Sequence, residues 1–390
     1  MIPSNRPGTL AARGAAVLQS TYGRYPIELV SGSGCRVTGA DGREYLDFVA
    51  GIAVSALGYA HPAVVDALRR GADGLIHVSN LYWTEPMVLL AERLTAAAGM
   101  ERAFFCNSGA EAVEAALKLG RKARPGRSGI VCFEGSFHGR TLGALSVTAR
   151  PRYQDPFRPL LPDVTVLPFG EPVALDERTG LVLVEPVQGE GGMRPAPPGW
   201  LAHLREACDA AGALLVFDEV QSGMGRTGSL FAYQAEGVLP DAVTVAKALA
   251  GGLPMGAVLA RGDAGTAFEP GDHASTFGGG PLVASVALAV LDVVLGDGFL
   301  AAVGERGGRL GEGLAALAAD RSGITGARGR GLMQGLVLSG PRASAVVEDL
   351  HRLGLLTCPA GPDVVRFVPP LIVSDAEVDE ALHLVRRAVG

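Results

Sequence analysis

One lysine of this sequence stands apart from the other basic residues. The 390-residue chain contains 34 Lys plus Arg, but only Lys118, Lys122 and Lys247 are lysines. The first two lie in a polar stretch, whereas Lys247 lies in TVAKALAGG (244–252), among apolar and small residues. Lysine is rarely buried without a purpose, and arginine cannot supply a primary amine. An exposed lysine at a strand end is the ordinary alternative, but a Schiff base between Lys247 and a carbonyl group would explain the exception.

A lysine that forms a Schiff base indicates pyridoxal phosphate, so the sequence must also provide a site for a phosphate group. The stretch NSGAEA (107–112) follows an apolar run and precedes a helical pattern. There Ser108, Gly109 and Ala110 would present backbone N–H groups and a hydroxyl at a helix N-terminus, where the helix dipole favours an anion. An ordinary helix cap would use the same residue types, so this stretch alone does not decide between the two.

The ring of such a cofactor needs an acid that holds the proton on its nitrogen, so that the ring can accept electrons. Asp218 ends the apolar run LLVFD, and ligands of parallel α/β sheets bind at the carboxyl ends of strands. Nearby, Gln221 could donate to the ring hydroxyl oxygen and Val220 could pack on one ring face. Phe137, in the loop GSFHGRT (135–141), is a candidate for the other face. An acidic helix cap and a core position are the alternatives for Asp218 and Phe137.

Short apolar runs alternate with helical patterns through the middle of the chain, which predicts an α/β fold with a mostly parallel sheet covered on both faces. The expected strands are 102–107, 129–135, 180–187, 213–220, 241–249 and 254–261, and the expected helices include 109–123 and 198–212. From about residue 297 the pattern changes to long Ala- and Leu-rich helices. We therefore expect a large domain over 55–296, and a smaller α+β domain formed by 1–54 together with 297–390.

The composition argues against several classes of function. A net charge of -6 and a pI near 5.7 disfavour a surface for nucleic acid or for anionic membranes. The cysteines lie far apart without a CxxC pair, which predicts reduced thiols rather than disulfides or a metal site. Residues 1–20 lack a long apolar core, and the apolar helical stretch 281–296 is too short to span a bilayer. We therefore expect a cytoplasmic protein without a bound metal.

Six motifs follow one another along the chain: NSGAEA, FHGRT, EPVQGEGG, FDEVQSGMGRTG, AKALAGGLPMGA and STFGG. In this order they resemble the class III (subgroup II) aminotransferases, and among these the acetylornithine aminotransferases, from about residue 20 to residue 385. The resemblance implies fold type I, pyridoxal phosphate as cofactor, and a homodimer with the active site at the interface. It implies transfer of the terminal (δ) amino group of N-acetylornithine to 2-oxoglutarate, as in arginine biosynthesis. The products would be N-acetylglutamate 5-semialdehyde and glutamate.

The resemblance also implies roles for the residues that would hold the cofactor. Lys247 matches the lysine that forms the Schiff base and later moves a proton between substrate and cofactor. Asp218 matches the acid beside the ring nitrogen, and Phe137 matches the stacking aromatic residue. Gly109 and Ala110 match the phosphate loop.

A second group of matches concerns the substrate and the partner subunit. Thr276, in STFGG, matches a threonine that reaches the phosphate from the partner subunit, and Ser275 matches a neighbour that contacts the substrate. Arg140 matches the arginine for the carboxylate at the far end of the amino donor. Arg366 matches the arginine that binds the carboxylate next to the reacting carbon of glutamate or 2-oxoglutarate. Glu190 matches the carboxylate that pairs with this arginine when the amino donor has no carboxylate next to its reacting carbon. An ordinary surface ion pair is the alternative for Glu190 and Arg366.

Two other amino donors stay open at this point: free ornithine, and lysine bound to an acidic carrier protein in lysine biosynthesis. The ornithine aminotransferases carry a tyrosine where this chain has Ile52, and an apolar residue fits a blocked amine better. A basic rim around the pocket would favour the carrier-bound substrate. A non-catalytic protein built on the same fold is a further alternative, against which the intact Lys247 and Asp218 argue. The chain departs from the family pattern at Gly280, where Asn is usual, so the contacts of that loop are not carried over.

Overall fold

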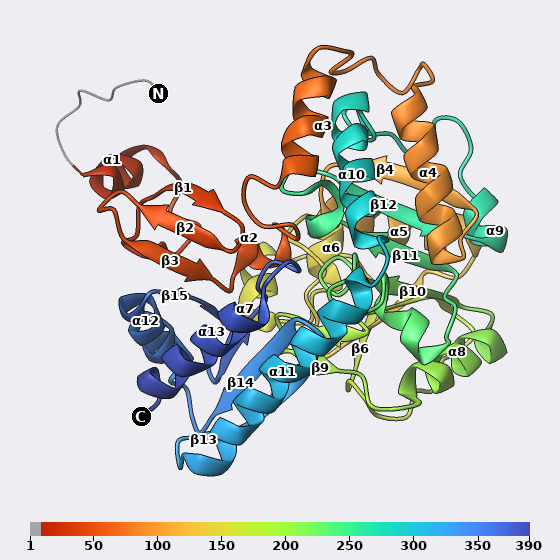
Figure 1. Cartoon of the computed structure of the whole chain (residues 1–390). Helices are drawn as coiled ribbons and strands as arrows, with labels where there is room; N and C mark the ends of the chain where they lie inside the picture. The colour runs from red at the N-terminus through yellow and green to blue at the C-terminus, as the bar shows by residue number, and fades with distance from the viewer. Residues whose placement is uncertain (1–8) are drawn as a thin grey trace.

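A seven-stranded sheet forms the middle of the molecule (Figure 1). The computed structural model describes residues 9–390. Residues 1–8, which belong to the expected N-terminal segment and to the stretch without an expected secretion signal, lie outside the described part. The order across the sheet is β4 (Arg102–Cys106), β12 (Gly256–Ala260), β11 (Ala242–Val245), β10 (Leu214–Asp218), β7 (Thr179–Val184), β5 (Gly129–Phe133) and β6 (Val164–Leu167). Of these seven strands, β12 runs in the direction opposite to the other six. The prediction of a mostly parallel sheet is thus confirmed.

Each face of this sheet has its own apolar core, because side chains alternate along a strand. On β10, Leu214 and Val216 belong to the core under α5 (Gly109–Ala123). Leu215 and Phe217 belong to the opposite core, under α4 (Glu85–Ala98), α8 (Trp200–Ala211) and α10 (Pro281–Val294). The sheet is therefore buried on both sides, as continuous apolar strands require.

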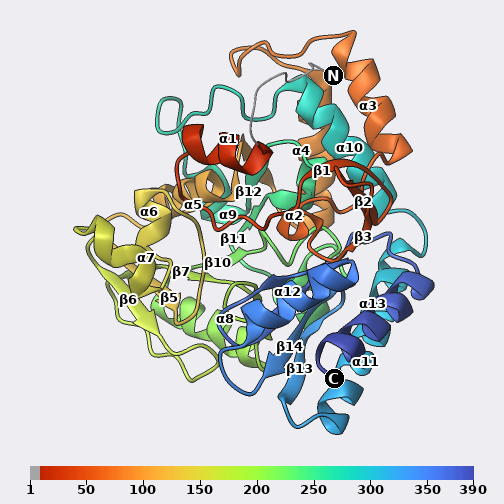
Figure 2. The same cartoon turned by 90° about the vertical axis from the view of Figure 1, so that its left-hand side faces the viewer.

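The two ends of the chain meet in a second layer, where the red N-terminal strands lie beside the blue C-terminal helices (Figures 1 and 2). One sheet has the order β1 (Leu29–Ser33), β2 (Arg36–Gly39), β3 (Glu44–Asp47) and β15 (Leu355–Leu356). Another has the order β13 (Ile324–Arg330), β14 (Met333–Leu338), β17 (Val364–Phe367) and β16 (Cys358–Pro359). The helices of this part are α11 (Phe299–Asp320), α12 (Ala343–Leu353) and α13 (Asp375–Ala388). Because β3 and β15 pair, 1–54 and 297–390 still fit one domain, which stays a proposal.

Shorter elements connect these layers. They are α1 (Leu10–Val17), α2 (Ala50–Ala53), α3 (Pro62–Ala72), α6 (Leu142–Ser146), α7 (Pro151–Gln154), η1 (Asp155–Phe157), β8 (Val187–Gln188), β9 (Arg194–Pro195), η2 (Ala232–Glu236), η3 (Lys247–Ala250) and α9 (Gly262–Thr266). Over residues 9–390, no single helix is long and apolar enough to cross a membrane; α10 and α11, bent by 70° at their junction, pass that test of length and composition only as a pair.

The strand expected over 241–249 is too long, and the error falls on the residue of interest. The strand β11 ends at Val245, and Lys247 has φ 44°, which an extended strand cannot accommodate. Lys247 instead opens the 3-10 turn η3. A non-glycine residue held at positive φ stores strain, and such positions concentrate at functional sites.

The strand that carries Asp218 tests how much the central sheet contributes to stability. Leu215 is fully buried in β10, so Leu215→Ala should lower the free energy of unfolding by about 2–5 kcal/mol, because it removes apolar contacts and leaves a cavity. Val166 on the edge strand β6 is 43% exposed, and Val166→Ala should change stability by about 0.5 kcal/mol or less. Urea unfolding of both variants measures this, and equal losses would contradict the account of the core.

Candidate active site

A cavity of about 420 Å³ lies where the central strands end. Its wall includes residues that follow the carboxyl ends of β5, β7, β10 and β11, which is the edge where α/β sheets bind ligands. The predicted site residues that line it are Ser108, Gly109, Ala110, Phe137, Arg140, Glu190, Asp218, Val220, Gln221 and Lys247. Side chains far apart in the sequence thus meet around one space.

Lys247 lies in the wall of this cavity. Burial lowers the pKa of the Lys247 amine, and this effect outweighs the opposing influence of the Glu190 and Asp218 carboxylates. A lower pKa increases the neutral fraction of the amine, and the neutral amine is the form that attacks a carbonyl carbon. The surroundings of Lys247 therefore suit a nucleophile better than a structural cation.

The start of α5 forms part of the cavity wall. Ser108 is the N-cap of this helix, and its Oγ accepts a hydrogen bond from the Glu111 N–H at 3.2 Å. The helix-cap interpretation is therefore correct, but the same turn also lines the cavity. Glycine at position 109 lets this turn approach Val220 closely, because a Cβ there would lie 2.7 Å from Cγ1 of Val220 and force that side chain to shift. The free N–H groups of this first turn can bind an anion.

Three groups hold the carboxylate of Asp218, which is 4% exposed. Its Oδ1 accepts hydrogen bonds from the Val220 N–H at 3.0 Å and from the Thr244 hydroxyl at 3.2 Å. Its Oδ2 lies 2.6 Å from Nδ1 of His138. An ionised carboxylate can only accept, so Nδ1 of His138 carries the proton of this bond. The fixed carboxylate at the cavity wall is suited to hold a protonated ring nitrogen.

Two buried polar residues of the cavity were missing from the prediction. His138 is 3% exposed, and its Nε2 has no partner within the described chain. Glu185 accepts hydrogen bonds from the N–H groups of Phe137 at 3.0 Å and Gly189 at 3.2 Å, so it joins two loops of the site. Burial raises the pKa of Glu185 to about 7. Glu185 directly follows the strand β7, and Asp218 is the last residue of the strand β10. Because both carboxylates come at the end of an apolar strand, the signal that pointed to Asp218 could also have identified Glu185.

Glu190 and Arg366 form an ion pair, and Nη1 of Arg366 donates to Oε1 of Glu190. The alternative of an ordinary surface pair is wrong, because Arg366 is 2% exposed. Its Nε also donates to Sγ of Cys358 at 3.2 Å. Burial alone would raise the pKa of Glu190, but Arg366 outweighs burial and lowers it. The carboxylate lines the cavity, whereas the guanidinium lies behind it.

The remaining predicted site residues lie outside the cavity wall. Ser275 is close to it, since its Oγ accepts a hydrogen bond at 3.2 Å from the amide of Asn107, which lines the cavity. Thr276 borders a separate small cavity beside 77–84. Gly280 is the N-cap of α10 and caps it without a side chain.

The donor set fits pyridoxal phosphate. An amine, a carboxylate, an aromatic ring and a helix N-terminus surround one space, and Oε1 of Gln221 is buried there without a partner in the described residues. Such a bare acceptor indicates that a hydrogen-bond donor belongs beside it. Lys247 would therefore hold the carbonyl carbon of the cofactor, and Asp218 its ring nitrogen. Phe137 would pack on the face of the ring, and the first turn of α5 would bind the phosphate.

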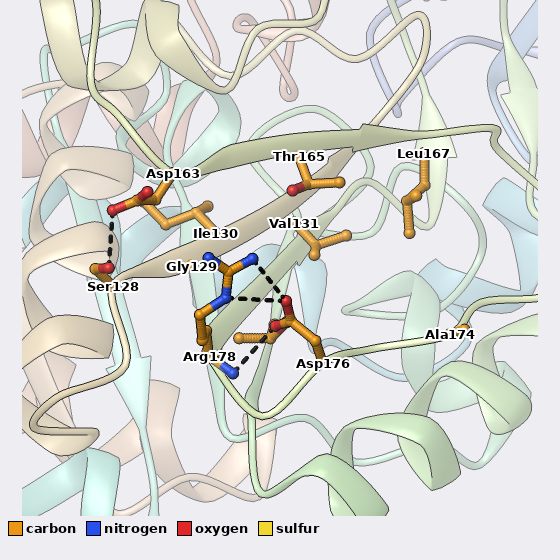
Figure 3. Close-up of a pocket in the computed structure, with 11 residues that line it drawn as sticks. Ser128, Gly129, Ile130, Val131, Asp163, Thr165, Leu167, Ala174, Asp176 and Arg178 are labelled. Atoms are coloured by element: carbon orange, nitrogen blue, oxygen red, sulfur yellow. Dashed lines mark hydrogen bonds and ion pairs between the residues drawn. The ribbon is translucent and has the colours of Figure 1, made fainter.

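A second cavity, of about 150 Å³, has a different character (Figure 3). It lies at the amino ends of β5, β6 and β7, so it is at the opposite edge of the sheet from Lys247. Its polar side chains bind one another: the Ser128 hydroxyl donates to Asp163 at 2.8 Å, and Arg178 pairs with Asp176 at 3.0 Å. Its charged side chains thus pair with neighbours in the same cavity, and its lining has no lysine, so the candidate site is the larger cavity.

Comparison with known proteins places this geometry in a family. Residues 17–389 match the model of the class-III aminotransferases. The acetylornithine aminotransferase of Gloeobacter violaceus is 49% identical over 374 residues, 93% of each chain, and that of Mycobacterium tuberculosis is 47% identical over 398 residues, 99% of this chain and 98% of the relative. The N-acetylornithine aminotransferase structure from Stenotrophomonas maltophilia has a TM-score of 0.83 and 38% identity, covering 97% of this chain and 98% of its own. An ornithine aminotransferase structure from Toxoplasma gondii has a TM-score of 0.93 and 30% identity, covering 97% and 94%.

The bond between His138 and Asp218 gives a test of the site. His138→Leu should weaken the binding of pyridoxal phosphate by about 10- to 100-fold, because a hydrogen bond to a charged group contributes about 1.5–3 kcal/mol. Equilibrium dialysis measures the dissociation constant. His203→Leu is the control, since the His203 side chain is 79% exposed on α8. If His138→Leu bound the cofactor as tightly as the control, His138 would have no part in holding Asp218.

Proposed function

The chain belongs to the class-III aminotransferases, which depend on pyridoxal phosphate, and we propose that it moves the terminal (δ) amino group of N-acetylornithine to 2-oxoglutarate. The products are N-acetylglutamate 5-semialdehyde and glutamate, and the reaction belongs to arginine biosynthesis. Relatives named acetylornithine aminotransferases at 47–49% identity support this substrate, as does the arrangement of charged groups in the cavity.

Lys247 and Asp218 are the proposed catalytic residues. When bound, pyridoxal phosphate supplies a carbonyl carbon for the amine and a ring that withdraws electrons from the reacting carbon. Burial lowers the pKa of the Lys247 amine, so this amine would hold the cofactor and, once free, would remove and return the proton at the δ-carbon of the donor. Asp218, held by His138 and Thr244, would keep a proton on the ring nitrogen. The backbone N–H groups that begin α5 would bind the phosphate, together with Ser108.

The pair of Glu190 and Arg366 is the observation that carries the proposed function. A terminal amine brings no carboxylate next to its reacting carbon, and Glu190 then covers the Arg366 charge. Glutamate and 2-oxoglutarate do bring one, and it replaces Glu190 on the guanidinium in a charge-assisted, bidentate contact. Arg140 lines the same cavity and would bind the carboxylate at the far end of the molecule. One pocket thereby accepts both kinds of substrate.

An apolar residue beside the cavity favours the acetylated donor over free ornithine. Ile52 lies two residues before Val54, which lines the cavity, in a turn where Ala50, Ile52 and Ala53 have φ between 49° and 64°. A β-branched residue at such a φ is a strained position and is held there by its surroundings. Ile52 has no group that could bind a free α-amine, whereas it suits an acetylated one.

The proposed assembly is a cytoplasmic homodimer. Several large apolar side chains are exposed close together in the sequence and near the Thr276 segment: Leu75, Ile76, Leu81, Tyr82, Trp83 and Phe277. The amide of Asn80 donates to the carbonyls of Ser275 and Gly278, both at 2.9 Å, so the two segments are joined. Exposed apolar surface of this kind favours burial against another chain. A second copy would cover it and bring its Thr276 to the phosphate, and the unpaired cysteines favour a reducing compartment.

Product analysis tests the function. The purified protein with N-acetylornithine and 2-oxoglutarate should form N-acetylglutamate 5-semialdehyde and glutamate in equal amounts, measured by mass spectrometry. Lys247→Arg should abolish nearly all of this turnover, because a positioned base alone contributes about 10²–10⁴-fold and arginine cannot form the Schiff base. Normal transamination by Lys247→Arg would overturn the assignment of Lys247.

The exchange at Arg366 predicts a change in substrate preference. In Glu190→Ala the Arg366 guanidinium has no carboxylate partner while N-acetylornithine is bound. The kcat/KM for N-acetylornithine should therefore fall, relative to that for glutamate, by about 10-fold or more, as expected for the loss of a charge-assisted contact. Pre-steady-state rates of the two half-reactions give this ratio. An unchanged ratio would show that Glu190 does not distinguish the substrates.

A further inference from the structure

The guanidinium of Arg140 is held by aromatic rings rather than by a carboxylate. Its Cζ lies 3.6 Å from the centre of the Tyr153 ring and 5.5 Å from that of Phe137. The two rings meet edge to face, with 6.4 Å between their centres and 88° between their planes. Throughout residues 9–390, no carboxylate pairs with Arg140. This cation at the cavity wall therefore has a cation–π partner in place of an ion pair.

The way in which Arg140 is held matters for its chemistry. A guanidinium is flat, and all of its N–H donors lie in its plane. A ring that stacks on the face leaves this edge free for a carboxylate. The edge of Arg366 is in contrast occupied by Glu190, Cys358 and the Pro359 carbonyl. Arg366, behind the cavity wall, thus has its donors covered, whereas the donors of Arg140, in the wall, stay open.

Tyr153 stands on a well-anchored support. It belongs to the short helix α7, which follows Arg150. The Arg150 guanidinium donates to the carbonyl of Gly135 at 2.9 Å, in the loop that carries Phe137 and Arg140. Gln154 is buried and its amide donates to the carbonyls of Leu145 and Ser146 on α6, at 3.0 and 3.1 Å. The ring is therefore fixed relative to the loop that carries Arg140.

We propose that Tyr153 is a positioning residue that sets substrate specificity by holding the face of Arg140, so that its open edge meets the carboxylate remote from the reacting amine. The inference rests on the proposed function for the identity of the substrates. Because the ring acts through the carboxylate, it affects only ligands that carry one. A tyrosine that merely filled space would affect stability and all amines alike.

The test compares Tyr153→Leu and Tyr153→Met, which lack a ring, with Tyr153→Phe, which keeps the ring face. The probe is glutarate, a dicarboxylate of the length of 2-oxoglutarate, and its dissociation constant for the holoenzyme is measured by calorimetry. We expect about 3- to 30-fold weaker binding in the Leu and Met variants, the range of a cation–π contact, and wild-type binding in the Phe variant. KM for glutamate should rise to a similar degree while kcat stays close to the wild-type value.

The specificity of the effect is measured with n-butylamine, which has no carboxylate. The rate at which it bleaches the cofactor absorbance should be the same in all four proteins. Wild-type glutarate binding in both ring-free variants would overturn the proposal, and so would an equal loss in Tyr153→Phe or an equal loss for n-butylamine. Failure of the wild-type enzyme to use N-acetylornithine is a separate result, which would remove the proposed substrate and leave the role of Tyr153 standing if glutarate still distinguished the variants.

Discussion

The buried guanidinium of Arg366 is the constraint on which the site depends. Removing one partner of a buried ion pair costs about 3–5 kcal/mol, so this charge must always have a carboxylate beside it. Glu190 lies between β8 and β9, which pair with each other, and Arg366 lies on β17, so the sheet formed by the end of the chain must pack against this pair of strands to join the two residues. In the proposed function a substrate carboxylate would take the place of Glu190, so the need of Arg366 for a partner would serve to distinguish the substrates.

A related constraint applies at the carboxyl ends of the central strands. Asp218 and Glu185 are buried there, and each is held by several donors, among them His138 for Asp218 and the N–H groups of two loops for Glu185. Buried carboxylates without such donors would be costly. The same bonds fix the loops that carry Phe137 and Glu190. Satisfying the polar groups of the site therefore also shapes the cavity around Lys247.

Much of this could be predicted from the sequence. The rarity of lysine singled out Lys247, the apolar runs gave the central strands, and the family motifs gave the residues of the cavity wall. The sequence did not give the end of β11, since the extended pattern continues past Val245 while the backbone turns at Lys247. Nor could it give the contact of His138 with Asp218, eighty residues away, or the stacking of Tyr153 on Arg140. Those depend on how loops of separate strands fold over one another, which has no periodic pattern.

The central claim is that one cavity binds the terminal amine of an acetylated donor while Glu190 pairs with the charge of Arg366. The most direct measurement is the absorbance of the purified holoprotein during separate additions of N-acetylornithine, free ornithine, and lysine attached to a carrier protein. The account predicts that the band of the lysine-bound cofactor bleaches at low concentrations of N-acetylornithine and recovers when 2-oxoglutarate is added. Bleaching by carrier-bound lysine alone would contradict the proposed substrate, and a protein that stays colourless with added cofactor would contradict the role of Lys247.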